Sequence, residues 1–246
     1  MLLFRVAVLA FCGLLLGVPV ARASSSDVPQ RLREALQTLA AEHHGLIGFH
    51  RHYVVTQRAP GHNEDDANDS GRLRDDGRLV WAHRYSGNAG GKQYTADDIA
   101  KVNAQLDKKP PGEDVDVPLS PDALAEYRLA PAACSSCAPG SIAFSFTSSK
   151  RDANHNDGMY IIDGRTGRLT QIVCHPAVLP KDADSGTITV TFGRVTPDLW
   201  SVVEVRQHWT GHVLFIHGSR DVVSAYSNYR RFSSLDQAHK SILAGI

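Results

Sequence analysis

The chain has 246 residues, of which 42% are hydrophobic, and its 26 lysine and arginine residues balance 26 aspartate and glutamate residues. A chain with no net charge offers no concentrated positive field of the kind that nucleic acid or an anionic membrane surface requires, so neither is an expected partner. The length is sufficient for a large domain with a real hydrophobic core.

The first 23 residues are typical of a secretory signal peptide. Arg5 supplies the positive charge, an apolar stretch runs from Val6 to Val20, and Ala21 and Ala23 place small residues where a signal peptidase requires them. At about 1.5 Å per helical residue this stretch is shorter than the roughly 30 Å hydrocarbon core of a bilayer. We therefore expect cleavage after Ala23, no membrane span in the mature chain, and a periplasmic or secreted location.

Helix and strand patterns succeed each other in the first part of the mature chain. Leu32, Leu36 and Leu39 stand at helical spacing in a predicted helix from Pro29 to Glu42. From Leu46 to Arg58 the period changes from 3.6 to 2, which predicts a strand with a mainly apolar and a mainly polar face.

Residues 60–77 are polar and acidic, without apolar periodicity, and we predict a solvated loop there. A strand is predicted from Leu79 to Tyr85. Thr95 and Asp98 form a capping-box-like start for a helix that ends at Lys108. A linker is predicted next, at 110–118, and residues 120–122 are predicted to start a short helical turn ahead of the cysteines.

From Ser141 onward the sequence is almost entirely strand and turn. Turns are predicted at 156–158, 164–167 and 210–211, where glycine, asparagine and aspartate favour tight reversals. The predicted strands are 142–146, 159–163, 169–174, 187–193, 202–209, 213–218 and 222–229. Short connections between them favour antiparallel neighbours.

A last helix follows a capping box from Ser233 to Asp236, and its predicted apolar stripe is Leu235, Ala238, Ile242 and Leu243. The sequence therefore predicts an α+β fold, with a large antiparallel sheet and amphipathic helices that cover one of its faces.

Three cysteines remain after signal cleavage: Cys134, Cys137 and Cys174. Exported proteins fold in an oxidising compartment, so we expect at least one disulfide among them. The C-x-x-C spacing of the first two also suits redox chemistry or zinc, but the prolines and glycine that flank it favour a structural disulfide in a loop. The sequence leaves open which cysteines pair.

Metal and catalytic motifs are weak. His50 and His52 share a strand face and could bind zinc or copper, but polar residues on a solvated face are the favoured explanation. Residues 152–163 resemble a calcium loop, yet the glycine is displaced and no terminal glutamate follows, so a plain hairpin turn is favoured. No familiar catalytic motif is present. We predict no catalytic residues, metal site or cofactor, and a non-enzymatic role is favoured although an enzyme stays open.

Several segments together resemble a pattern found in lipoprotein carriers of the LolA type. The strand Met159–Asp163 ends in aspartate, Thr166 and Gly167 follow before Leu169, and Gly186–Phe192 is a glycine-headed strand that alternates threonine with apolar residues. The first predicted helix and the strand up to Arg58 also resemble the opening of this superfamily, which includes LolA, LolB and RseB-like proteins.

The resemblance implies that residues 24–246 form a single curved antiparallel half-barrel, with amphipathic helices covering its concave face. It also implies a periplasmic protein that binds a lipid, a lipoprotein or another hydrophobic ligand. Relatives include envelope sensors, so a sensor or protein-interaction module on the same scaffold is the alternative, followed by a metal-dependent enzyme.

Aromatic residues on the predicted strands would line the ligand cavity, or else form the core beneath the helices. The candidate ligand-binding residues are Phe49, Tyr53, Trp81, Tyr85, Phe144, Phe146, Phe192 and Phe215.

Overall fold

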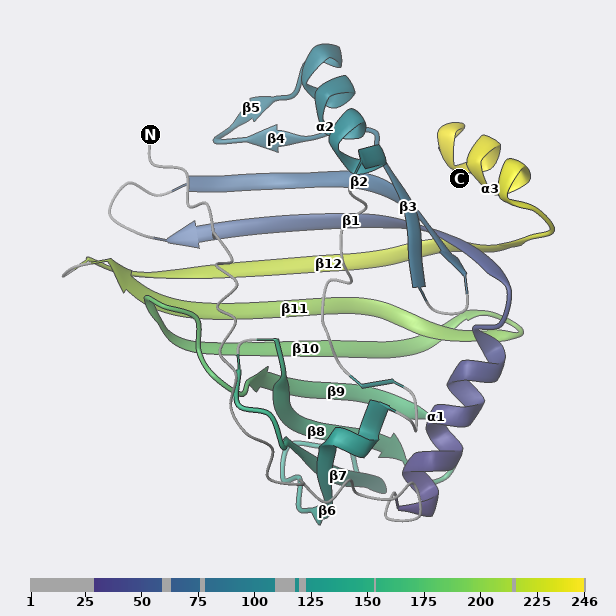
Figure 1. The fold of residues 1–246 in the computed structure, drawn as a ribbon, viewed down its shortest axis with the longest axis vertical. Helices are drawn as coiled ribbons and strands as arrows, with labels where there is room; N and C mark the ends of the chain where they lie inside the picture. Colours follow the sequence, from purple (N-terminus) through teal and green to yellow (C-terminus); the bar gives the residue numbers. More distant parts are fainter. Residues whose placement is uncertain are drawn as a thin grey trace, which may run out of the picture.

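A ten-stranded sheet with the order β3-β2-β1-β12-β11-β10-β9-β8-β7-β6 forms the body of the computed structural model (Figure 1). Every pairing in it is antiparallel. The strands are β1 Leu46–Arg58, β2 Asn63–Asp75, β3 Arg78–Arg84, β6 Tyr127–Ala132, β7 Ser141–Ser148, β8 Asn156–Asp163, β9 Leu169–Pro176, β10 Ala183–Thr196, β11 Leu199–Val213 and β12 Ile216–Phe232. Because β1 pairs with β12, the first and last strands in the sequence are neighbours within the sheet.

The remaining elements are α1 Gln30–Glu42, α2 Ala96–Lys108, α3 Leu235–Leu243, the 3-10 helix η2 Ala123–Glu126 and a small hairpin of β4 Asn88–Ala89 and β5 Lys92–Gln93. The structure describes residues 29–58, 63–75, 78–108, 118–119, 123–152, 154–213 and 216–245. The predicted signal peptide, the 120–122 turn and all of the predicted linker except Pro118 lie outside these residues. No helix among the described residues is long and apolar enough to cross a membrane.

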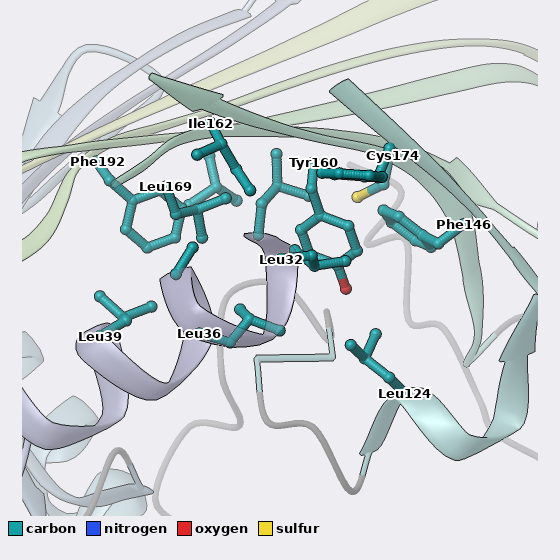
Figure 2. Close-up of a cluster of buried hydrophobic side chains, with 14 of the residues drawn as sticks. Leu32, Leu36, Leu39, Leu124, Phe146, Tyr160, Ile162, Leu169, Cys174 and Phe192 are labelled. Carbon is teal, nitrogen blue, oxygen red and sulfur yellow. The ribbon is translucent and has the colours of Figure 1, made fainter. Parts of the chain in front are cut away.

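Helix α1 lies in the curve of the sheet, across β8, β9 and β11 (Figure 2). Leu32 and Leu36 are completely buried, and they share one apolar cluster with Tyr160, Ile162 and Ile172 of the sheet. Burial of such side chains stabilises the fold by about 1.5–3 kcal/mol each. We call the sheet face that contacts α1 the inner face and the opposite face the outer face.

The other two helices do not share this face. Ala238 and Ile242 of α3 pack against Tyr85 and Phe232. The Arg231 side chain contacts the end of α1 and therefore lies on the inner face. Neighbouring residues of a strand point to opposite faces, so Phe232 points to the outer face. Because α3 packs against Phe232, α3 lies on the outer face. The α+β fold with a curved antiparallel sheet is confirmed, and α1 is the helix that covers its concave face.

Helix α2 protects the edge of the sheet at β3. Its Asn103 side chain accepts a hydrogen bond from the Arg84 backbone N–H at 2.6 Å and donates one to the Arg84 carbonyl at 3.0 Å. This side-chain amide replaces a neighbouring strand, which limits pairing with another chain. The predicted cap is present, because Thr95 and Asp98 exchange hydrogen bonds at the start of α2.

The predicted loop at 60–77 is wrong, because β2 occupies most of it. This strand pairs with β1 on one side and with β3 on the other, so its backbone groups are satisfied without an apolar side-chain pattern. The tertiary context overrides the poor strand propensity of these polar residues.

Two predicted turns are also wrong. Residues 156–158 begin β8, and residues 210–211 lie inside the continuous strand β11. In both places glycine permits close contact instead of a reversal. A Cβ on Gly158 would lie 2.3 Å from the Val173 carbonyl oxygen, and one on Gly211 would lie 2.3 Å from the Asp182 carbonyl oxygen.

The last helix starts one residue later than predicted. Ser234, rather than Ser233, is the N-cap, and its hydroxyl accepts a hydrogen bond from the Gln237 N–H at 3.3 Å. Only Ala238 and Ile242 of the predicted stripe are buried, whereas Leu235 and Leu243 are 49% and 56% exposed.

Glu42 fixes the end of α1 to the sheet. One carboxylate oxygen accepts a hydrogen bond from Arg168 Nη2 at 2.7 Å, and the other accepts one from the Trp200 backbone N–H at 2.7 Å. Arg231 also donates to the Glu42 carbonyl. Burial raises the pKa of the Glu42 carboxyl, but the hydrogen bonds from Arg168 and Trp200 outweigh it, and the net pKa lies below its ordinary value.

Glu42→Gln is expected to lower the free energy of unfolding by about 1–3 kcal/mol near neutral pH, since charge-assisted hydrogen bonds are lost in a half-buried place. Because the folded pKa lies below the unfolded one, this stabilisation is complete above the unfolded pKa and disappears as the pH falls through the folded pKa. Urea denaturation at about pH 7 and about pH 3 measures the difference. Glu34→Gln is the control, because Glu34 bonds only exposed partners on α1; an equal loss in both variants would contradict the expectation.

Candidate functional site

Beyond α1, the inner face carries an aromatic group with an unusual backbone. Asn228 adopts a positive φ of 52°, and the register between β1 and β12 shifts at this point. The resulting bulge turns both Tyr226 and Tyr229 toward Phe49, although alternation would place them on opposite faces. Each tyrosine ring lies 5.3 Å from the ring of Phe49.

Two arginines continue this face from the aromatic group. Arg51 on β1 and Arg84 at the end of β3 both pair with Ser70 of β2, which lies between them. Their guanidinium carbons lie 4.6 Å and 5.1 Å from the centre of the Tyr53 ring, and each arginine is only 9% exposed. We call Arg51, Tyr53 and Arg84 the arginine–tyrosine cluster.

Arg84 differs from an ordinary buried charge. Its Nε is buried and has no hydrogen-bond partner, and no ion pair of Arg84 is found in the described part of the chain. Stacking on Tyr53 stabilises the cation by about 0.5–2 kcal/mol. A buried charge normally costs several kcal/mol unless an opposite charge meets it. The cluster can therefore hold an anionic group beside an aromatic surface.

Apolar side chains extend the inner face away from this cluster. The alternation of β1, β11 and β12 places Val55, Trp209 and Val222 there, and all three are partly exposed. Trp209 lies over Gly186, where an added Cβ would meet the indole ring at 2.3 Å. Gln207 and Arg220 pair with Val222 and Trp209 on the same face, so this part of the inner face carries partly exposed apolar side chains among polar ones.

The predicted ligand-binding residues separate into groups. Phe144, Phe146 and Phe192 lie in the core cluster beneath α1, and Figure 2 labels Phe146 and Phe192 there. Phe49 and Tyr53 lie on the inner face of β1. Tyr85 stacks on His50 with their ring centres 5.8 Å apart, on the outer face beneath α3. Trp81 belongs to β3, but its side chain is not described, and Phe215 lies outside the described residues. A ligand-binding role for these residues stays a prediction.

Sequence reasoning included Tyr53 but missed Arg51 and Arg84 of the arginine–tyrosine cluster, and also the aromatic neighbours Tyr226 and Tyr229. One signal was present, because Arg51 stands between Phe49 and Tyr53 at the period of two that marks the apolar face of β1. A charged residue in that position indicates a functional or paired cation. Nothing local in the sequence connects it with Arg84, which joins it through β2.

Three possible metal ligands meet elsewhere, on the outer face. Donor atoms of Asp184, His212 and His217 all lie within 4.8 Å of one another. Neither histidine could be positioned from its sequence pattern. The pair His50 and His52 gains no third ligand among the described residues.

The cysteines are now assigned. Cys134 and Cys137 form a disulfide, with their Cα atoms 5.4 Å apart, in the loop between β6 and β7. Cys174 is free and buried in the cluster under α1. Burial raises the pKa of its thiol to about 12.

Comparisons with known proteins reveal similar folds only. No protein-family model matches the sequence, and no curated protein matches it. A putative outer membrane lipoprotein-sorting protein domain from Vibrio parahaemolyticus is 10% identical, with 86% of this chain and 99% of that chain covered and a TM-score of 0.43. A LolA superfamily protein from Nitrosomonas europaea is 11% identical, with coverage of 84% and 96% and a TM-score of 0.35.

A MucA/MucB complex from Pseudomonas aeruginosa also matches, with 9% identity, coverage of 82% and 99%, and a TM-score of 0.24. The solved structures that this chain is similar to include proteins of the LolA type, as the resemblance in the sequence led us to expect. At these values the similarity carries nothing about ligand, partner or activity.

Cys174 should resist thiol reagents in the native protein. At about pH 8 a thiol with a pKa of about 12 is ionised in roughly one molecule in 10,000, and the thiolate is the reactive form. We expect the native oxidised protein to show no reactive thiol, and the same protein in denaturant to show one that Cys174→Ser removes. Rapid labelling of native protein at Cys174 would show that the site is open.

Proposed function

We propose that the protein is a non-enzymatic binding protein of the periplasm that holds an amphipathic, lipid-like ligand on its inner face. The observation that carries the proposal is Arg84, a buried cation stacked on Tyr53 at 5.1 Å with no anionic partner in the described chain. An acidic head group would meet this charge. An apolar chain would lie on the adjoining surface that includes Val222 and Trp209.

Both parts of such a ligand would gain binding energy. Each methylene group removed from water contributes about 0.8 kcal/mol. A hydrogen bond between a guanidinium and a carboxylate or phosphate contributes roughly 1.5–3 kcal/mol. The ligand class therefore includes fatty acids, acidic lipids and the acyl chains of a lipoprotein.

The periplasmic location is part of the proposal. The signal sequence at residues 1–23 supports export, and the Cys134–Cys137 disulfide is typical of an oxidising compartment.

A sensor or protein-interaction module is the second candidate. It is favoured by α3, whose Leu235 and Leu243 remain 49% and 56% exposed although the helix buries its other apolar residues. A contact surface for a protein partner would require these leucines to belong to a contiguous apolar patch, because single exposed leucines are common on protein surfaces.

Competition between two ligands tests the primary proposal. Protein purified from the periplasm is loaded with a fluorescent fatty acid, which is then displaced by oleate or by oleyl alcohol, two chains that differ in the head group. We expect oleate to bind about tenfold more tightly, because only its carboxylate meets Arg84.

Arg84→Gln should remove this preference and leave the affinity for oleyl alcohol nearly unchanged. Arg206→Gln is the matched control, because Arg206 is exposed on the outer face and pairs with Glu204. The proposal is wrong if wild-type protein binds neither chain, or if the preference for oleate survives in Arg84→Gln. Absence of binding together with capture of a protein partner through α3 would favour the second candidate.

A further inference from the structure

The ends of β10, β11 and β12 bring three metal-ligating side chains together on the outer face. His212 of β11 lies directly opposite His217 of β12. Asp184 of β10 joins them from the other side, with 2.7 Å from its Oδ1 to His212 Nδ1 and 3.7 Å from its Oδ2 to His217 Nδ1. The two imidazole centres are 5.5 Å apart.

The backbone beside these residues is arranged to bring Asp184 to the histidines. The register between β10 and β11 shifts between Ala183 and Ser185, so Asp184 is an extra residue in β10. Such a bulge redirects a side chain. Asp182 has a positive φ of 70°, and its carbonyl accepts a hydrogen bond from the His212 N–H at 2.9 Å. Gly211 allows this approach, since a Cβ there would lie 2.3 Å from the Asp182 oxygen.

We propose that Asp184, His212 and His217 form a binding site for a divalent transition-metal ion of the zinc and copper class. Two imidazoles and one carboxylate are the donors that these ions prefer, whereas calcium and magnesium require oxygen ligands. Three protein ligands leave a fourth position for water or another small ligand.

The geometry requires little adjustment. In a tetrahedral zinc site with bonds of about 2.0–2.1 Å, neighbouring ligand atoms lie about 3.4 Å apart. The donors here already lie within 4.8 Å of one another. The side chains of Asp184, His212 and His217 are 41%, 42% and 75% exposed, so small rotamer changes close the site without disturbing the core.

An ordinary ion pair on the same face provides the comparison. His208 Nδ1 lies 2.6 Å from Asp221 Oδ1, across the same two strands. This pair satisfies a single histidine, and no third donor joins it in the described chain. At Asp184 a second imidazole is placed beside the first, so three donor atoms from three strands lie within 4.8 Å of one another.

Calorimetric titration of the untagged, full mature protein with Zn²⁺ and with Cu²⁺ tests the site. We expect one ion per chain at this site and tighter binding of Cu²⁺ than of Zn²⁺. Asp184→Asn and His217→Ala should each weaken Zn²⁺ binding by more than the roughly 10- to 100-fold that loss of an outer-shell partner causes. His208→Ala should leave it unchanged.

The thermal midpoint of each variant is measured with and without Zn²⁺, because an ion that joins three strands stabilises the folded state. We expect Zn²⁺ to raise the midpoint in wild type and His208→Ala, and not in His217→Ala. The variants should fold, since the substituted side chains are exposed. Absence of binding to either ion in wild type would overturn the proposal, as would equal affinity in wild type and His217→Ala.

Discussion

The apolar stripe of α1 is buried against the inner face of the sheet, and this contact holds the curved half of the molecule in shape. Leu32 and Leu36 fill the space beneath β8, β9 and β10, where a flat sheet would expose its apolar face to water. Glu42 then ties the end of the helix to Arg168 and Trp200. Hydrophobic burial supplies most of the stability, while the ionic contacts fix where the helix stops.

The inner face differs in composition between the two halves of the sheet. Between β12 and β3 no described helix covers the inner face, and its side chains include the cations Arg51 and Arg84. The cost of burying these charges is offset in part by the Tyr53 ring. One continuous sheet thus combines a half whose inner face is covered by α1 with a half whose inner face carries two buried cations.

Two irregularities in the strands bring side chains together. The bulge at Asn228 gathers two tyrosines on Phe49, beside the arginine–tyrosine cluster, and the bulge at Asp184 directs a carboxylate toward two histidines. Regular alternation would have separated these groups. Arg51 and Arg84, by contrast, meet through regular pairing of β1, β2 and β3.

The sequence by itself determined the elements whose patterns are local. Local patterns were sufficient to predict α1 from its leucine spacing, β1 from its alternation, and the start of α2 from the cap at Thr95 and Asp98. The tertiary structure alone decided that 63–75 is a strand, because its order comes from two neighbours and not from its side chains. It also decided which residues meet, since Arg84 joins Arg51 and Asp184 joins His212 through strand pairing between positions distant in the chain.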